Sequence, residues 1–221
     1  MSKGETWTNY LILSLVTFLF FMLELFSIFV IEKMILNVSI NNYTETQMGI
    51  HSLLTSGLWA VAIIIILFFS YKKYNFPKKS YEKIYKRNWM IVFIALALCK
   101  VITFIDYGTL KVIGEFEEKG IFRFSAQYIY YFFEIGLVLL IIMYGQKAIE
   151  VLLKRKSEVP FGGIILALTW GAFHFVSRGK GIEVWNGVSC MIFSILSGII
   201  YLNVKRKIPY SYLLIAIGYL L

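Results

Sequence analysis

The chain has 221 residues, of which 59% are hydrophobic and only 16% are charged. Such a composition excludes an ordinary soluble domain and indicates an integral membrane protein with a single transmembrane domain, residues 1–221. The formal net charge of +9 does not predict nucleic-acid binding, because the lysines stand in short clusters between apolar runs, where they set topology and meet anionic lipid.

Seven apolar runs predict membrane-spanning helices, each of which needs roughly 20 mainly apolar residues. The first run is too long for a signal-peptide core and has no small-residue cleavage site after it, so we expect it to stay as an anchor. We therefore expect an all-α bundle of about seven transmembrane helices. The predicted spans are residues 9–32, 50–70, 88–106, 127–146, 160–177, 187–204 and a shorter last one at 208–221.

The basic residues lie mainly in alternate connections, after the second, fourth and sixth spans: "YKKYNFPKKSYEKIYKRN", "QKAIEVLLKRKSEVP" and "VKRK". Lysine-rich connections face the cytoplasm, so the N-terminus should lie inside and the C-terminus outside a cell membrane. The mixed-charge connection "GTLKVIGEFEEKGIFRFSAQ" then lies outside and is predicted to contain an amphipathic segment at the membrane interface.

Four ionisable residues stand out well inside the predicted spans: Glu24, Lys100, Glu134 and His174. Such residues are costly in hydrocarbon and usually face the bundle interior at a site. At about 1.5 Å per residue, all four lie roughly 18–22 Å from the inner ends of their spans. They could therefore share one layer, in which Glu24 and Lys100 are predicted to form a structural ion pair.

Glu134 and His174 are the predicted catalytic pair of this layer. Glu134 has no basic partner in its own span, so it must be protonated or find His174 or Lys100 across the bundle. A Glu-His pair in a dry site suits general acid-base chemistry, whereas a structural histidine would only donate to a carbonyl of a neighbouring helix. Asp106, Arg178 and Asn186 lie nearer the outer water interface, so the site should open outward.

Nucleophile and metal patterns are weak. Cys99 and Cys190 lie in apolar segments without disulfide or metal spacing, and both are expected to pack as small hydrophobes. The remaining nucleophile candidates are Ser189 and Cys190, at the outer end of the sixth span, together with Ser177 and Ser125. We expect no metal and no cofactor.

The last part of the chain, from about Gln127, resembles the CPBP superfamily of CAAX prenyl protease and bacteriocin-processing membrane proteins. The stretch "GGIILALTWGAFHF" looks like the family's second motif, in which an aromatic residue precedes a histidine by four positions, here Trp170 and His174. The segment "FSILSGIIYLNVKRKIPYSYLLIAIGYLL" resembles the family's following Gly-rich helix, basic turn and last helix. The resemblance implies a CPBP-like bundle.

The chain departs from the catalytic members of that family. Their paired glutamates and following arginine align with Leu139, Leu140 and Tyr144, and their last histidine falls near Leu214 or Ile215. A metal-dependent peptidase site normally needs about three protein ligands. The resemblance therefore predicts the family's fold more strongly than it predicts peptidase activity.

The superfamily also includes divergent bacterial members implicated in N-terminal acylation of lipoproteins, and this chain looks like that kind of member. The implied reaction is acyl transfer from a phospholipid or lipidated neighbour to an amine, with His174 as general base and Glu134 orienting it. The expected partners are the membrane, a phospholipid or lipoprotein substrate and a further protein subunit. Substrate-binding residues predicted at the outer end are Trp170, Arg178, Trp185 and Asn186, with Lys180 as a further phosphate contact.

Two alternatives stay open. The loss of the first-motif glutamates favours a non-catalytic immunity or scaffold protein that binds an enzyme through its outer loops. A peptidase would instead combine Glu134 and His174 with His51 or a bound water.

Overall fold

A computed structural model describes residues 6–177 and 181–221, and within them the protein is all-helical, without strands. Short 3₁₀ turns occupy Phe20–Met22 and Ile40–Asn42, and π-helical segments occupy Ser27–Ile35 and Ala167–Gly171. The α-helices in chain order are α1 (Trp7–Leu19), α2 (Leu23–Phe26), α3 (Glu45–Tyr74), α4 (Lys86–Tyr107), α5 (Lys111–Glu118), α6 (Ile121–Leu152), α7 (Phe161–Leu166), α8 (Val184–Asn203) and α9 (Ile208–Leu220).

Five of the helical stretches are long and apolar enough to cross a membrane, so the chain is a multi-pass membrane protein. Two shorter apolar helices fall on the predicted spans 160–177 and 208–221, so every predicted span coincides with an apolar helix. The five long stretches are Trp7–Ile35, Glu45–Tyr74, Lys86–Glu118, Ile121–Leu152 and Val184–Asn203.

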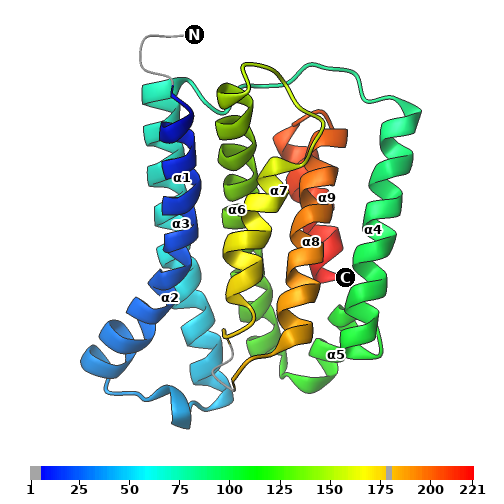
Figure 1. Ribbon diagram of the computed structural model, residues 1–221. Coiled ribbons are helices and arrows are strands. Elements are labelled where there is room, and N and C mark those ends of the chain that lie inside the picture. The colour runs from blue at the N-terminus through cyan, green and yellow to red at the C-terminus, as the bar shows by residue number, and fades with distance from the viewer. Residues whose placement is uncertain (1–5, 178–180) are drawn as a thin grey trace.

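The helices run up and down, and the three lysine-rich connections lie at the end of the bundle where α1 begins (Figure 1). This alternation is the one expected from the sequence. Which end faces the cytoplasm stays a prediction based on the distribution of lysine.

Helix α6 lies at the centre of the bundle, with α1 and α3 on one side and α7, α8 and α9 on the other (Figure 1). Two thirds of its most apolar window is buried within the protein, compared with 17% for the stretch that contains α4. Helix α4 stands at the edge farthest from α1 and contacts α8 and α9. An apolar face as exposed as that of α4 suits contact with lipid.

Glycines allow α7 to pack directly on its neighbours. A Cβ on Gly162 would lie 2.1 Å from the carbonyl oxygen of Ile142 in α6, and one on Gly163 would lie 2.7 Å from the carbonyl oxygen of Ser194 in α8. Small residues at such crossings let backbones approach closely in membrane proteins. The contact fixes the helix that leads to His174.

The predicted span 160–177 is helical as far as Phe173, whereas its last four residues, 174–177, form turns. The helix ends soon after the π-helical segment, and the backbone N–H groups of His174, Phe175 and Val176 bond to carbonyls three residues earlier. Irregular backbone at membrane depth is tolerated where it is buried in protein or lines a cavity. His174 therefore lies on a turn and not on a regular helix.

The predicted ion pair between Glu24 and Lys100 is also wrong. Glu24 accepts a hydrogen bond from the Tyr130 hydroxyl at 3.1 Å and lies 3.3 Å from Nε2 of His51. The Lys100 ammonium is buried without a hydrogen-bond partner in the described residues. Helices α2 and α4 stand at opposite edges of the bundle (Figure 1), so an equal depth would not bring these side chains together.

Candidate functional site

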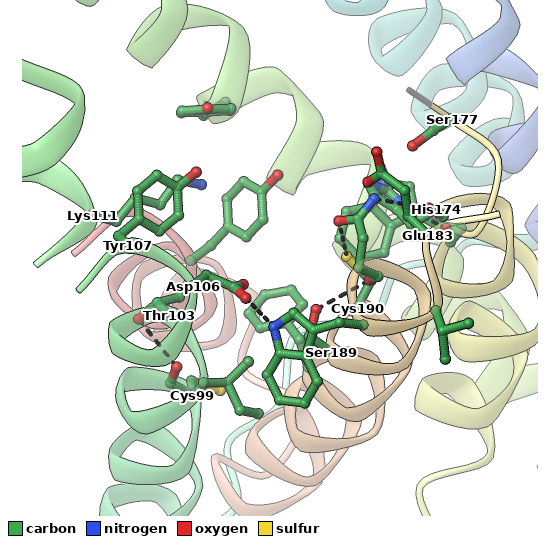
Figure 2. Close-up of a pocket in the computed structure, with 18 residues that line it drawn as sticks. Cys99, Thr103, Asp106, Tyr107, Lys111, His174, Ser177, Glu183, Ser189 and Cys190 are labelled. Carbon is green, nitrogen blue, oxygen red and sulfur yellow. Dashed lines mark hydrogen bonds between the residues drawn. The ribbon is translucent and has the colours of Figure 1, made fainter. Parts of the chain in front are cut away.

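A cavity of about 750 Å³ opens between α4 and α8, at the end of the bundle away from the lysine-rich connections. We call it the α4–α8 cavity. Figure 2 shows polar side chains of α4, α5 and α8 facing it. Its lining residues are Cys99, Ile102, Thr103, Asp106, Tyr107, Lys111, Tyr131, Trp170, His174, Ser177, Glu183, Val184, Trp185, Asn186, Ser189, Cys190, Phe193 and Tyr219.

His174 lines this cavity, and its ring is oriented by its own chain. Nδ1 lies 2.7 Å from the backbone oxygen of Trp170, and the side-chain amide of Asn186 donates to the backbone oxygen of His174 at 2.8 Å. A carbonyl oxygen only accepts, so Nδ1 carries a proton, and in the neutral form of the ring the lone pair lies on Nε2. That tautomer is the one a general base requires.

Glu134 does not orient His174, contrary to the sequence-based expectation. Its side chain is 5% exposed; one oxygen accepts from the Trp170 indole at 3.3 Å and the other from the Tyr219 hydroxyl at 3.0 Å. No hydrogen bond joins it to His174 within the part of the chain that the structure describes. Since Trp170 and Tyr219 both line the cavity, Glu134 acts as a support behind its wall.

Three of the predicted substrate-binding residues, Trp170, Trp185 and Asn186, line the cavity. The Trp185 indole donates to the carboxylate of Asp106, which joins the start of α8 to the end of α4. The predicted phosphate contacts Arg178 and Lys180 lie outside the described residues.

Two nucleophile candidates lie on one face of α8, next to the histidine turn. Ser189 and Cys190 both line the cavity (Figure 2). The Ser189 hydroxyl donates to the backbone oxygen of Asn186 at 3.1 Å, and the Cys190 sulfur lies 4.0 Å from the side-chain oxygen of Asn186. Asn186 therefore contacts both the histidine turn and the hydroxyl and thiol of α8.

Sequence reasoning missed the cationic wall of the cavity. Lys111 opens α5, and its ammonium lies over the rings of Tyr219 and Tyr131, with 3.9 and 4.3 Å to the ring centroids. The sequence placed this lysine in an outer connection, where a basic residue carries little information. What the sequence did contain is Gly108, whose φ of 66° ends α4 and allows the chain to turn back.

A second polar group, which we call the His51 cluster, joins the end of the first helical stretch to α3. Nδ1 of His51 lies 2.8 Å from Glu32, and Nε2 faces Glu24. The Tyr43 hydroxyl also donates to Glu32, and burial together with this bond raises the pKa of Tyr43. Every ring nitrogen and both carboxylates of the His51 cluster thus have partners.

No group of three or more His, Cys, Asp or Glu side chains in residues 6–177 and 181–221 is arranged to hold a metal ion. Comparisons of the chain with family models, curated proteins and solved structures found no match. The resemblance to the CPBP superfamily therefore stays a prediction from the quoted motifs.

Proposed function

We propose that the protein acts at the outer leaflet of a cell membrane as an acyltransferase, or as the catalytic subunit of one, in N-terminal modification of lipoproteins. The observation that supports this most is the contact of His174 Nδ1 with the Trp170 carbonyl, which holds the ring in place where His174 lines the α4–α8 cavity. The proposal includes that the bundle has a CPBP-like fold and that the membrane is a bacterial plasma membrane.

In this reaction, Nε2 of His174 takes a proton from the α-amine of the lipoprotein. The amine nitrogen then attacks the carbonyl carbon of an acyl ester, and a new amide bond replaces the ester bond. The proton on Nε2 passes to the leaving alkoxide, which departs as a lysolipid hydroxyl. If Cys190 takes part, its thiol accepts the acyl group first and returns it to the amine, with His174 moving the proton in both steps.

A non-catalytic scaffold is the second candidate. Trp170 and Asn186 bind the ring and the carbonyl of His174 in a way that would also suit a structural histidine. On this alternative, the α4–α8 cavity holds a lipid or a lipidated peptide for another enzyme, and the histidine only shapes the wall.

Mass spectrometry of lipoprotein N-termini in a deletion strain tests the proposal. We expect the deletion to remove the N-linked acyl chain, wild type to restore it and His174→Ala to fail although inserted normally. Thr103→Val is the matched control, because Thr103 lines the opposite wall and its hydroxyl bonds only to carbonyls of α4. Full complementation by His174→Ala would support the scaffold instead.

A further inference from the structure

The most unusual charge in the protein is that of Lys111. The side chain lines the α4–α8 cavity, yet the residue is only 5% exposed. An ammonium group removed from water is costly unless an anion or another polar partner replaces its hydration. The groups around Lys111 must therefore replace the water that its ammonium has lost.

Aromatic faces supply part of that replacement. The ammonium lies 3.9 Å from the ring centroid of Tyr219 and 4.3 Å from that of Tyr131. Both rings are held from behind, because Tyr219 donates to Glu134 and Tyr131 donates to Glu115. A cation over two fixed rings is stabilised by their quadrupoles, and more so when it is removed from water.

The nearby carboxylates bond to other groups. Oε1 of Glu115 forms an ion pair with Lys119 at 3.2 Å, while the buried Oε2 of Glu115 has no hydrogen-bond partner among the described residues; Asp106 accepts the indole hydrogen of Trp185. Among the described residues, no hydrogen bond or ion pair reaches the ammonium of Lys111. A buried cation directed at a cavity, with rings behind it and no carboxylate bound to it, is arranged to receive an anion from the cavity.

We propose that Lys111, with Tyr131 and Tyr219, binds the phosphate group of a phospholipid whose acyl chains enter from the exposed side of α4. A phospholipid carries its phosphate and its acyl esters on one glycerol unit, so a phosphate at Lys111 brings an ester into the cavity that His174 also lines. Figure 2 shows the two side chains on opposite sides of this space. The donor role of this lipid rests on the proposed function, whereas its binding does not.

Native mass spectrometry of the purified protein tests the binding without any turnover. Wild type should bind phosphatidylglycerol at least roughly tenfold more tightly than diacylglycerol with the same chains, because only the former offers a charge-assisted bond. Lys111→Met should reduce this preference to about threefold or less, and Lys111→Arg should keep it. Lys100→Met is the matched control, since Lys100 is also buried in the bundle but does not line the cavity.

A preference that survives in Lys111→Met would overturn the proposal. If Lys111→Met does not fold, chemical acetylation of Lys111 in the wild-type protein is the alternative measurement. Phosphatidylglycerol should protect the Lys111 amine from acetylation, and diacylglycerol should not. Equal protection by both lipids would also overturn the proposal, and equal protection by inorganic phosphate alone would overturn the lipid as source. The two proposals can fail separately. If wild type prefers phosphatidylglycerol as expected but His174→Ala still complements the deletion strain, the lipid site is supported and the acyltransferase activity is rejected.

Discussion

The two histidines of the chain have opposite surroundings. His51 lies between two carboxylates that are themselves bound by further hydroxyls, whereas His174 faces a cavity of about 750 Å³. Ionisable groups in the membrane are commonly interpreted as functional. The comparison indicates that position distinguishes these two: His51 is enclosed between carboxylates and does not line the α4–α8 cavity, whereas His174 lines it and can reach a ligand there.

Removal of His51 should have the largest effect on stability. Both ring nitrogens face carboxylate oxygens, an arrangement that suits an imidazolium with two donors. His51→Ala would leave Glu24 and Glu32 facing each other without it, and should lower the free energy of unfolding by about 3 kcal/mol or more. Thermal unfolding in detergent measures this, with acylation per folded molecule as the control, which we expect to be unchanged. A loss below about 1 kcal/mol would show that the His51 cluster is not structural.

Replacing His174 with alanine should instead affect turnover more than stability. His174→Ala removes a proposed base from the cavity wall, so turnover should fall at least about 100-fold, equivalent to about 2.7 kcal/mol in the activation free energy. The free energy of unfolding should change by only about 1 kcal/mol, the usual net value of a hydrogen bond such as that from Nδ1 to the Trp170 carbonyl. Turnover of a lipopeptide by purified protein, normalised to folded material, is the measurement. Retention of half the wild-type rate would remove the catalytic role.

Glu134→Gln should change stability less than His51→Ala and turnover less than His174→Ala. Its amide oxygen can still accept from Trp170, and its amide nitrogen can donate to the Tyr219 hydroxyl, so stability should change by about 1 kcal/mol or less. Because Glu134 supports the wall without touching His174, turnover should fall by less than roughly tenfold. A fall as large as that of His174→Ala would instead show that the two residues act as one unit.

The smallest effect on stability is expected for Glu82, whose carboxylate lies outside the membrane-spanning segments. A hydrogen bond from Lys156 is the main cause that lowers the pKa of Glu82. The pair therefore adds stability above the pKa of the unfolded carboxyl, and loses it as the pH falls through the lower folded pKa. The side chains are 47% and 69% exposed, so screening limits the gain to about 0.5 kcal/mol or less.

The unfolding temperatures of wild type and Glu82→Gln, compared at pH 7 and at pH 3, measure this gain. We expect a small difference at pH 7 that disappears at pH 3. A difference as large as that for His51→Ala would mean that solvent exposure does not separate the two kinds of carboxylate.

The sequence predicted the helices well, because their length and apolar content are local properties. It could not predict which side chains meet, since that depends on the order in which α2, α4 and α6 stand across the bundle. The ion pair of Glu24 with Lys100 failed for this reason.

The candidate site was predictable only in part. Apolar context singled out His174 and its neighbours Trp170 and Trp185, because an ionisable ring in an apolar run is conspicuous. Lys111 had no such context, since it becomes buried only when α5 folds back against Tyr131 and Tyr219. A charged residue in a connection between helices can be recognised as part of a site only once the position of that connection in the fold is known.

The π-helical segment Ala167–Gly171 has a consequence for how this chain is aligned with others. A π turn holds about one residue more than an α turn, and one residue rotates everything after it by about 100° around the helix axis. Gly162 and Gly163, before the segment, and His174, after it, are therefore set by two separate registers. An alignment to an unbroken helix needs a one-residue gap within 167–171; without it, either the glycines or the histidine will be matched to the wrong column.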